Sequence, residues 1–172
     1  CPKCPGRAQA AWLAAREAEL LDVPYVHVVF TLPHLLSPLA LQNPRVLYTL
    51  LFQAVAETLL TVARDPHHLG AEIGFLAVLH TWGQTLSCHP HVHFVVPAGG
   101  VDANGEWVWP VFPEHRFLFP VHALAKAYRG KFIAGLKQAY ANGTLQFPGD
   151  LAPLADEDDF EAWLDAMVSK NW

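Results

Sequence analysis

Charged residues are scarce in this chain of 172 residues, at 16% of the total against 52% hydrophobic residues. Two long stretches, residues 23–44 and 73–101, contain no Asp, Glu, Lys or Arg. This composition excludes a disordered chain. Both stretches are as long as a membrane span, but prolines interrupt the first, and histidines and a Gly-Gly pair interrupt the second. Because neither could satisfy its backbone as a lipid-exposed helix, we expect buried strands and no membrane role.

Cysteine is also rare, with only Cys1, Cys4 and Cys88. Three cysteines do not make a disulfide framework, and their spacing suits metal binding in a reducing cytosol. The chain has no initiator Met and no charged-then-apolar leader, and it ends directly after a helical pattern. We therefore expect a fragment of a longer protein.

The net charge of −5 is unevenly distributed along the chain. Residues 1–149 hold ten basic and nine acidic side chains, whereas residues 150–172 hold one basic and seven acidic ones. The overall charge therefore neither favours nor excludes a nucleic-acid partner.

Hydrophobic periodicity predicts an α+β domain with an antiparallel sheet. Alanine-rich residues 7–21 predict a helix, and strict alternation over residues 25–32 predicts a strand. Asn43-Pro44 is a typical helix start, with Asn as N-cap, and this helix should end at Asp65-Pro66. Strands are expected at 73–82, 91–97, 95–102 and 106–110, with a turn at Asn104-Gly105, and helices at 121–141 and 156–170.

The segment HPHVHFVVP, residues 89–97, concentrates histidines at the start of an apolar run. Side chains alternate in a strand, so His91 and His93 should share one face, about 6.5–7 Å apart along the backbone. Two neutral imidazoles on a rigid strand can share one cation, although exposed histidines without a role are the alternative. Such a site needs a third ligand and an open position for a substrate oxygen. The candidates for the third ligand are Gln84, Ser87, His80 and His89.

The triplet His91-Val92-His93 matches the His-hydrophobe-His (HUH) signature of single-strand DNA nucleases. The wider sequence resembles the two-tyrosine, rolling-circle insertion-sequence transposases. The segments that carry this resemblance are CPKCPGRAQAAWLAAREAELLDVPYVHVVFTLPH, LGAEIGFLAVLHTWGQTLSCHPHVHFVVPAGGV and YRGKFIAGLKQAY. The resemblance implies a ferredoxin-like HUH fold with about 4–5 antiparallel strands and helices packed on the sheet.

The resemblance also implies a mechanism. In that family a tyrosine attacks a DNA phosphodiester, giving a 5′-phosphotyrosine and a free 3′-OH. A cation, usually Mg²⁺ or Mn²⁺, polarises the scissile phosphate. His91 and His93 would be the catalytic metal ligands, with Gln84 as the third. The partners would be single-stranded transposon ends and target DNA, in the bacterial cytoplasm at the nucleoid. Nothing in the sequence predicts the oligomeric state.

The four tyrosines depart from the family pattern. Tyr25, Tyr48, Tyr128 and Tyr140 include no pair spaced four apart on a helix. We expect the nucleophilic pair beyond this chain, which would leave the chain alone inactive. By the resemblance, residues 1–22 are the end of a zinc-binding segment plus a helix. Residues 23–149 are then an incomplete HUH core, and residues 150–172 an acidic helix leading to the tyrosine region.

Three further groups have both a functional and a plain interpretation. Cys1 and Cys4 resemble the end of the family's Zn²⁺ site, but a tetrahedral site needs four ligands, so free thiols are the alternative. A basic stripe on the helix at 121–141 is a candidate for contacts with DNA phosphates, or else a solvated helix face. Trp107 and Trp109 could stack bases, although packing is the plainer role. The stripe consists of Lys126, Arg129, Lys131 and Lys137.

Two other functions are alternatives to a transposase. The first is a DNA-binding module without catalysis. The second is a metal-dependent hydrolase that uses the HxH pair, but that class draws its further ligands from a large barrel, and 172 residues are too few for eight βα units.

Overall fold

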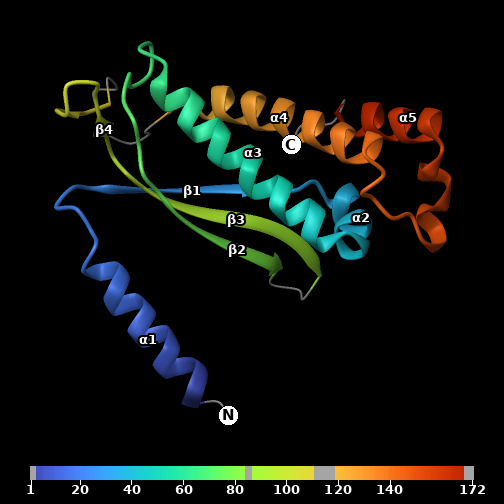
Figure 1. Ribbon diagram of the computed structural model, residues 1–172, viewed down its shortest axis with the longest axis horizontal. Helices are drawn as coiled ribbons and strands as arrows, with labels where there is room; N and C mark the ends of the chain where they lie inside the picture. Colours follow the sequence, from blue (N-terminus) through green and yellow to red (C-terminus); the bar gives the residue numbers. More distant parts are fainter. Residues whose placement is uncertain (1–2, 84–86, 111–118, 169–172) are drawn as a thin grey trace.

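Three antiparallel strands form the sheet at the centre of the computed structural model, which describes residues 3–83, 87–110 and 119–168 (Figure 1). Strand β3 (Cys88–Pro97) lies between β1 (Tyr25–Thr31) and β2 (Leu76–Trp82). In the register, Val29 and Val78 both lie opposite His93, and Thr31 and His80 both lie opposite His91. The predicted hairpin of β2 and β3 is confirmed, and β1 adds to its other edge.

The remaining elements follow in chain order around this sheet. The helices are α1 (Lys3–Glu17), α2 (Ser37–Gln42), α3 (Pro44–Arg64), α4 (Val121–Ala141) and α5 (Glu157–Val168). Short 3-10 helices span His34–Leu36 and Gly149–Ala155. Strands β4 (Gly100–Val101) and β5 (Trp107–Val108) form a separate two-stranded sheet. The predicted α+β class with an antiparallel sheet is confirmed.

The strands are divided between two sheets because β3 cannot continue past Pro97. Gly99 and Gly100 follow it, and both lie where a side chain does not fit. A Cβ on Gly99 would lie 2.6 Å from the carbonyl oxygen of Val108, and one on Gly100 would lie 2.5 Å from that of Glu72. The chain bends at Ala98 and Gly99, and among the described residues the hairpin around Asn104-Gly105 pairs with itself and, at one bridge, with Glu72.

The core lies between the sheet and α3 and α4, which cover one face of it (Figure 1). Val92, Phe94 and Val96 of β3 are fully buried there. Helix α3 contributes Leu47, Leu51, Val55 and Leu59 at helical spacing, and α4 contributes Leu124, Tyr128, Phe132 and Leu136. Within the described residues, α3 is the one helix long and apolar enough to cross a membrane, and here its apolar side is part of this core.

Two predictions about helix positions need correction. The first helix begins earlier and ends at Glu17 rather than Leu21. Between β1 and α3, where no helix was predicted, the chain forms a 3-10 turn followed by α2, because Pro38 occupies a position in the first turn where its missing N–H costs nothing. Helix α4 has the predicted bounds.

Asn43 precedes α3 as predicted but makes no side-chain cap. Its buried amide instead joins distant segments. The Nδ2 group donates to the carbonyl oxygens of Leu39, at 3.1 Å, and Gln146, at 2.9 Å, while Oδ1 accepts from the N–H of Gln146 at 2.7 Å. Asn43 therefore ties the start of α3 to the segment after α4.

Replacing Asn43 by Ala should lower the free energy of unfolding by about 1–3 kcal/mol, because it leaves buried backbone groups without partners. Asn43→Asp should also destabilise, since a carboxylate accepts from Gln146 but cannot donate to the two carbonyls. Urea denaturation measures both. The exposed Asn142→Ala variant is the control and should stay within about 0.5 kcal/mol of the parent. An Asn43→Ala protein as stable as this control would contradict the proposed tie.

Candidate metal centre

The face of the sheet opposite α3 and α4 carries a cluster of histidines. Along β3 the side chains alternate, so that Val92, Phe94 and Val96 enter the core and His91 and His93 point to the other face. The rings of His91 and His93 lie 4.9 Å apart, which confirms the predicted placement on one face of a central strand. Val29, Val78 and His80 around them are exposed, so this face is open to solvent.

His80 of β2 completes a group of three histidines. The ring of His80 lies 4.5 Å from that of His93 and 5.3 Å from that of His91. One nitrogen from each of the three imidazoles lies within 4.8 Å of the other two. Three converging nitrogens of this kind can hold a transition-metal ion and leave further positions for oxygen ligands. Among the candidates for the third ligand that the structure describes, His80 is the one that it brings together with His91 and His93.

Hydrogen bonds leave the right atoms of the ligand rings available. Nδ1 of His91 lies 2.7 Å from the carbonyl oxygen of His89, which can only accept, so Nδ1 carries the proton and Nε2 has a free lone pair. Nε2 of His93 is buried and has no hydrogen-bond partner. A buried polar atom without a partner is costly, and a bound cation would satisfy it.

Electrostatics keep His93 in the form that binds metals. Burial lowers the pKa of His93 below its ordinary value, and the neighbouring imidazoles of His80, His91 and His27 lower it further. A neutral ring can donate its lone pair to a cation, whereas a protonated ring cannot. The fit of these residues to a metal therefore rests on the geometry of all three rings and on the lowered pKa of His93.

Several predicted ligands fall outside the cluster. Gln84 and Cys1 lie outside the described residues, as does the side chain of Cys4, so the third-ligand and zinc predictions for them stay predictions. The ring of His89 lies 5.3 Å from that of His91, but His89 is not part of the group of three. Ser87 accepts a backbone hydrogen bond from Gly83 at the loop between β2 and β3.

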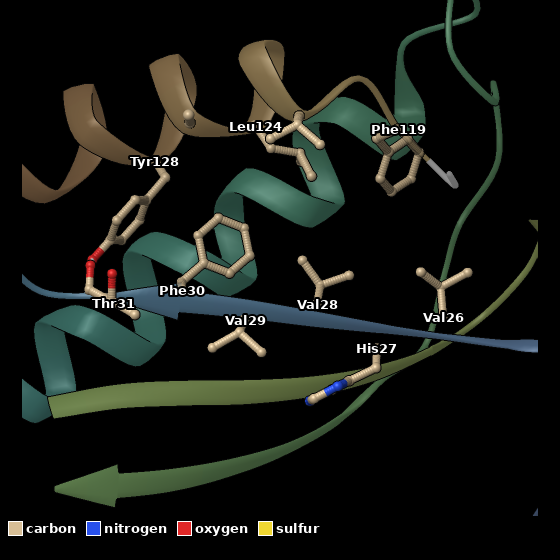
Figure 2. A pocket seen from close by; sticks show the side chains of 11 residues that line it. Val26, His27, Val28, Val29, Phe30, Thr31, Phe119, Leu124 and Tyr128 are labelled. Atoms are coloured by element: carbon tan, nitrogen blue, oxygen red, sulfur yellow. The ribbon is translucent and has the colours of Figure 1, made fainter. Parts of the chain in front are cut away.

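The four tyrosines hold structural positions. Tyr128 is buried, its hydroxyl donates to the carbonyl of Thr31 at 3.3 Å, and burial raises its pKa well above the ordinary value (Figure 2). The Tyr140 hydroxyl donates to the carbonyl of Ala155, and burial raises its pKa too. The Tyr25 hydroxyl accepts from the N–H of Leu21. Burial, followed by the influence of Cys88, raises the pKa of Tyr48.

The cavity beside Tyr128 does not belong to the histidine site. It has a volume of about 330 Å³ and lies between β1 and α4. Figure 2 shows Val28, Phe30 and Leu124 around it, on the side of β1 that faces α4, while His27 points to the other side over β3. The cavity is thus an imperfectly filled part of the interface between α4 and the sheet.

Two of the four residues of the predicted basic stripe on α4 form ion pairs with acidic residues of other helices. Lys131 pairs with Glu57 of α3 at 3.5 Å, and Lys137 forms an ion pair with Glu161 of α5. Among the described residues, Lys126 and Arg129 have no acidic partner within ion-pair distance. Helix α4 also covers the face of the sheet opposite the histidines (Figure 1). Contacts of all four with DNA phosphates stay a prediction, and they would lie in a different layer from the histidine cluster.

Among the tryptophans, Trp82 is an exposed residue that the sequence analysis did not consider. Trp107 packs beneath Gly99, and its ring lies 5.8 Å from that of Trp109, which supports the packing role. Trp82, in contrast, is 57% exposed at the end of β2, two residues after His80. Exposure alternates through Val78, His80 and Trp82, but the register with β3 shifts between His80 and Trp82, so that Trp82 lies opposite Cys88. Alternation therefore places Val78 and His80, and not Trp82, on the histidine face.

Comparison with known families identifies two matching segments. Residues 74–172 match a family described as putative transposase. Residues 1–32 match the transposase zinc-binding domain. The first segment contains β2 and β3 with their three histidines, and the second contains α1 and β1.

Two curated relatives are transposases in name. The chain is 47% identical over 173 residues to "Putative transposase y4qJ" of Sinorhizobium fredii, which covers 100% of the chain and 43% of the relative. It is 41% identical over 107 residues to "Transposase for insertion sequence element IS801" of Pseudomonas savastanoi pv. phaseolicola, which covers 62% of the chain and 25% of that relative. The chain thus spans less than half the length of these relatives.

Solved structures of the relaxase TrwC share the fold. A structure of TrwC complexed with a 27-mer DNA matches with a TM-score of 0.51 and 16% identity, over 82% of this chain and 54% of that one. A metal-free structure of TrwC in complex with OriT DNA has the same TM-score and identity over 65% of this chain and 43% of that one. The fold is therefore of the HUH type that the sequence predicted.

The geometry of the three histidines predicts one divalent-ion site per chain. Titration calorimetry with Mn²⁺ should show it, and replacing His80, His91 or His93 by Ala should each weaken binding by at least about 10²-fold, since each removes a direct ligand. His67, which is exposed on the turn after α3, provides the control His67→Ala, with unchanged affinity. Equal binding by the His80→Ala variant and the parent would remove His80 from the site.

Proposed function

Because the chain belongs to the rolling-circle transposases of the IS91 type, we propose that it supplies the metal-binding and DNA-binding part of an HUH single-strand DNA transposase. The observation that carries this proposal is the convergence of His80, His91 and His93 on the open face of the sheet. A site on an exposed, shallow face suits an extended polynucleotide better than a small molecule, which would need an enclosed pocket.

The residues fit a cation that completes its coordination with substrate oxygens. Three neutral imidazoles supply the protein ligands, and the partnerless Nε2 of His93 is one of them. Three nitrogen ligands suit Mn²⁺ better than Mg²⁺, which prefers oxygen. When bound, the ion would polarise the scissile phosphate and neutralise its developing negative charge. A loosely completed site of this kind would also exchange its metal readily.

The chain's own residues position the reacting group. The three histidines stand on two hydrogen-bonded strands, so their spacing is held by the sheet rather than by a loop. Val29 and Val78, the direct neighbours of His93 across the strands, are exposed apolar side chains. They flank the site without competing for the cation, and a phosphodiester could approach across them.

The nucleophile would come from a tyrosine outside this chain. In the proposed step, the phenolic oxygen forms a bond to phosphorus, the bond from phosphorus to the 3′ oxygen breaks, and the phenolic proton ends on the 3′ oxygen. The products are a 5′-phosphotyrosine and a free 3′-OH. The hydroxyl hydrogen bonds of Tyr25, Tyr128 and Tyr140 and their positions support this division, as does the length of the curated relatives.

The proposal extends to partners and location. Single-stranded transposon ends and target DNA would be the substrates, in the bacterial cytoplasm at the nucleoid. Residues 1–22 would end a zinc-binding segment that includes Cys1 and Cys4, residues 23–149 would be the HUH core, and residues 150–172 would lead to the tyrosines. By itself the chain would be a metal-dependent DNA-binding module. No feature of the described residues favours the alternative of an HxH hydrolase.

Nicking by a longer relative tests the mechanism. The Sinorhizobium fredii protein, incubated with labelled hairpin single-stranded DNA and Mn²⁺, should form a covalent adduct visible on a denaturing gel. Replacing the residues that align with His91 and His93 by Ala should reduce the adduct by at least about 10²-fold, because the phosphate loses its charge stabilisation. The present chain should bind the same DNA without forming an adduct. An adduct with this chain would show that one of its own tyrosines is the nucleophile.

Trp82 should contribute to binding by stacking on a base. Its ring is exposed at the end of β2, two residues after His80, and stacking on an aromatic side chain is worth about 1–3 kcal/mol per base. Trp82→Ala should therefore weaken binding of a fluorescent oligo-dT by about 5- to 160-fold in fluorescence anisotropy.

Two variants control this measurement. Trp82→Phe keeps an aromatic face and should retain most of the affinity. Trp109→Ala removes a tryptophan that is 47% exposed but lies beyond the two-stranded sheet, and it should bind like the parent. An equal loss for Trp109→Ala and Trp82→Ala would argue against a stacking site at the end of β2.

A further inference from the structure

A fourth histidine, His27 of β1, contacts the cluster from outside. His27 lies opposite Val95 in the register, diagonally across from His93. The two ring planes are nearly parallel, 8° apart, with centroids 5.0 Å apart, and the rings meet edge to edge, with Nε2 of His27 2.7 Å from Nδ1 of His93. Figure 2 shows His27 on the side of β1 away from Val28, Phe30 and α4. His27 is not one of the three histidines whose nitrogens converge.

The short contact between the two rings fixes where their protons lie. A neutral imidazole has one nitrogen that donates and one that accepts. His93 must keep the lone pair of Nε2 free if it is to bind an ion together with His80 and His91, so its proton belongs on Nδ1. Nδ1–H then donates to Nε2 of His27, and His27 carries its own proton on Nδ1. One arrangement of protons satisfies both the hydrogen bond and the metal site.

We propose that His27 is a positioning residue for the metal centre, holding the His93 ring in the Nδ1–H tautomer and in the orientation that directs Nε2 at the ion. The inference rests on the proposed metal site and adds to it a residue from the first strand. A hydrogen-bond acceptor behind a ligating histidine fixes its tautomer and makes it a better ligand, and its loss costs about 10- to 100-fold in metal affinity.

His91, the other proposed ligand on β3, also donates a hydrogen bond from Nδ1, but to a different kind of acceptor. Nδ1 of His91 donates to the backbone carbonyl of His89 within its own strand. For His93, the acceptor is the side chain of His27, which belongs to the neighbouring strand β1. Consequently, the orientation of His93 depends on the pairing of β1 with β3, whereas that of His91 does not. The acceptor for His93 is a side chain and can be replaced by mutation, whereas the acceptor for His91 is a backbone carbonyl and cannot.

Two substitutions of His27 separate hydrogen bonding from ring packing. Gln places a side-chain oxygen near the position of the imidazole Nε2 and can accept from His93, while Phe keeps a flat aromatic ring without an acceptor. Because His27 is exposed, both variants should fold, which circular dichroism verifies. The control Tyr25→Phe changes a residue on the same face of β1 that makes no contact with the cluster. Mn²⁺ affinity is measured by calorimetry on the complete chain.

His27→Phe should weaken Mn²⁺ binding by about 10- to 100-fold, and His27→Gln should recover most of the affinity. Equal affinities of the Phe variant and the parent, or equal losses for Phe and Gln, would overturn the proposal. A second readout needs no metal: long-range ¹⁵N–¹H NMR should show His93 protonated at Nδ1 in the parent and a mixture of tautomers in the Phe variant. If the parent binds no Mn²⁺ but the NMR result holds, the metal site fails while the contact between His27 and His93 stands. A parent that binds Mn²⁺ with His93 protonated at Nε2 would overturn the role of His27 alone.

Discussion

The pairing of β3 on both of its edges is the constraint on which the site depends. Val92, Phe94 and Val96 are fully buried on one face of this strand, and burial of each contributes about 1.5–3 kcal/mol. A shift of one residue in register would expose all three side chains and bury His91 and His93 in their place. The hydrophobic core therefore specifies which face carries the histidines and which residues of β1 and β2 stand beside them. Packing on one side of the sheet sets the chemistry on the other.

The two faces of the sheet are covered unequally, and the less covered face, which carries the histidines, is accessible to a ligand. Helices α3 and α4 fill one face (Figure 1), and the exposed Val29, Val78 and His80 belong to the other. An open sheet offers a rigid support on which side chains from three strands can contact an extended polymer. The histidines proposed as metal ligands and the positioning residue His27 all lie on this face. Each of the three strands supplies at least one histidine to it.

The core elements could be predicted from the sequence, whereas the segments that depend on tertiary contacts could not. Helices α3 and α4 and the hairpin of β2 and β3 follow from strong periodicity and clear stop signals, and they were predicted with small errors at their ends. Asn43 was predicted as a cap, but its amide bonds to a segment about a hundred residues away, which no local pattern reveals. The division into two sheets depends on Gly99 and Gly100 approaching the backbone of β5 and of Glu72, and that is again a long-range contact.

The sequence alone determined that two histidines share one face of a buried strand, because alternation is a local property of an extended backbone. It also carried the family resemblance, which rests on the order of residue types. Only the tertiary structure decided that His80 joins them and that His27 stands behind His93, because strand neighbours and register result from packing the whole core. The tertiary structure also decided which basic residues on α4 are paired, since Glu57 and Glu161 reach Lys131 and Lys137 from other helices. Local periodicity fixes where a side chain points, and only the assembled core fixes what it meets there.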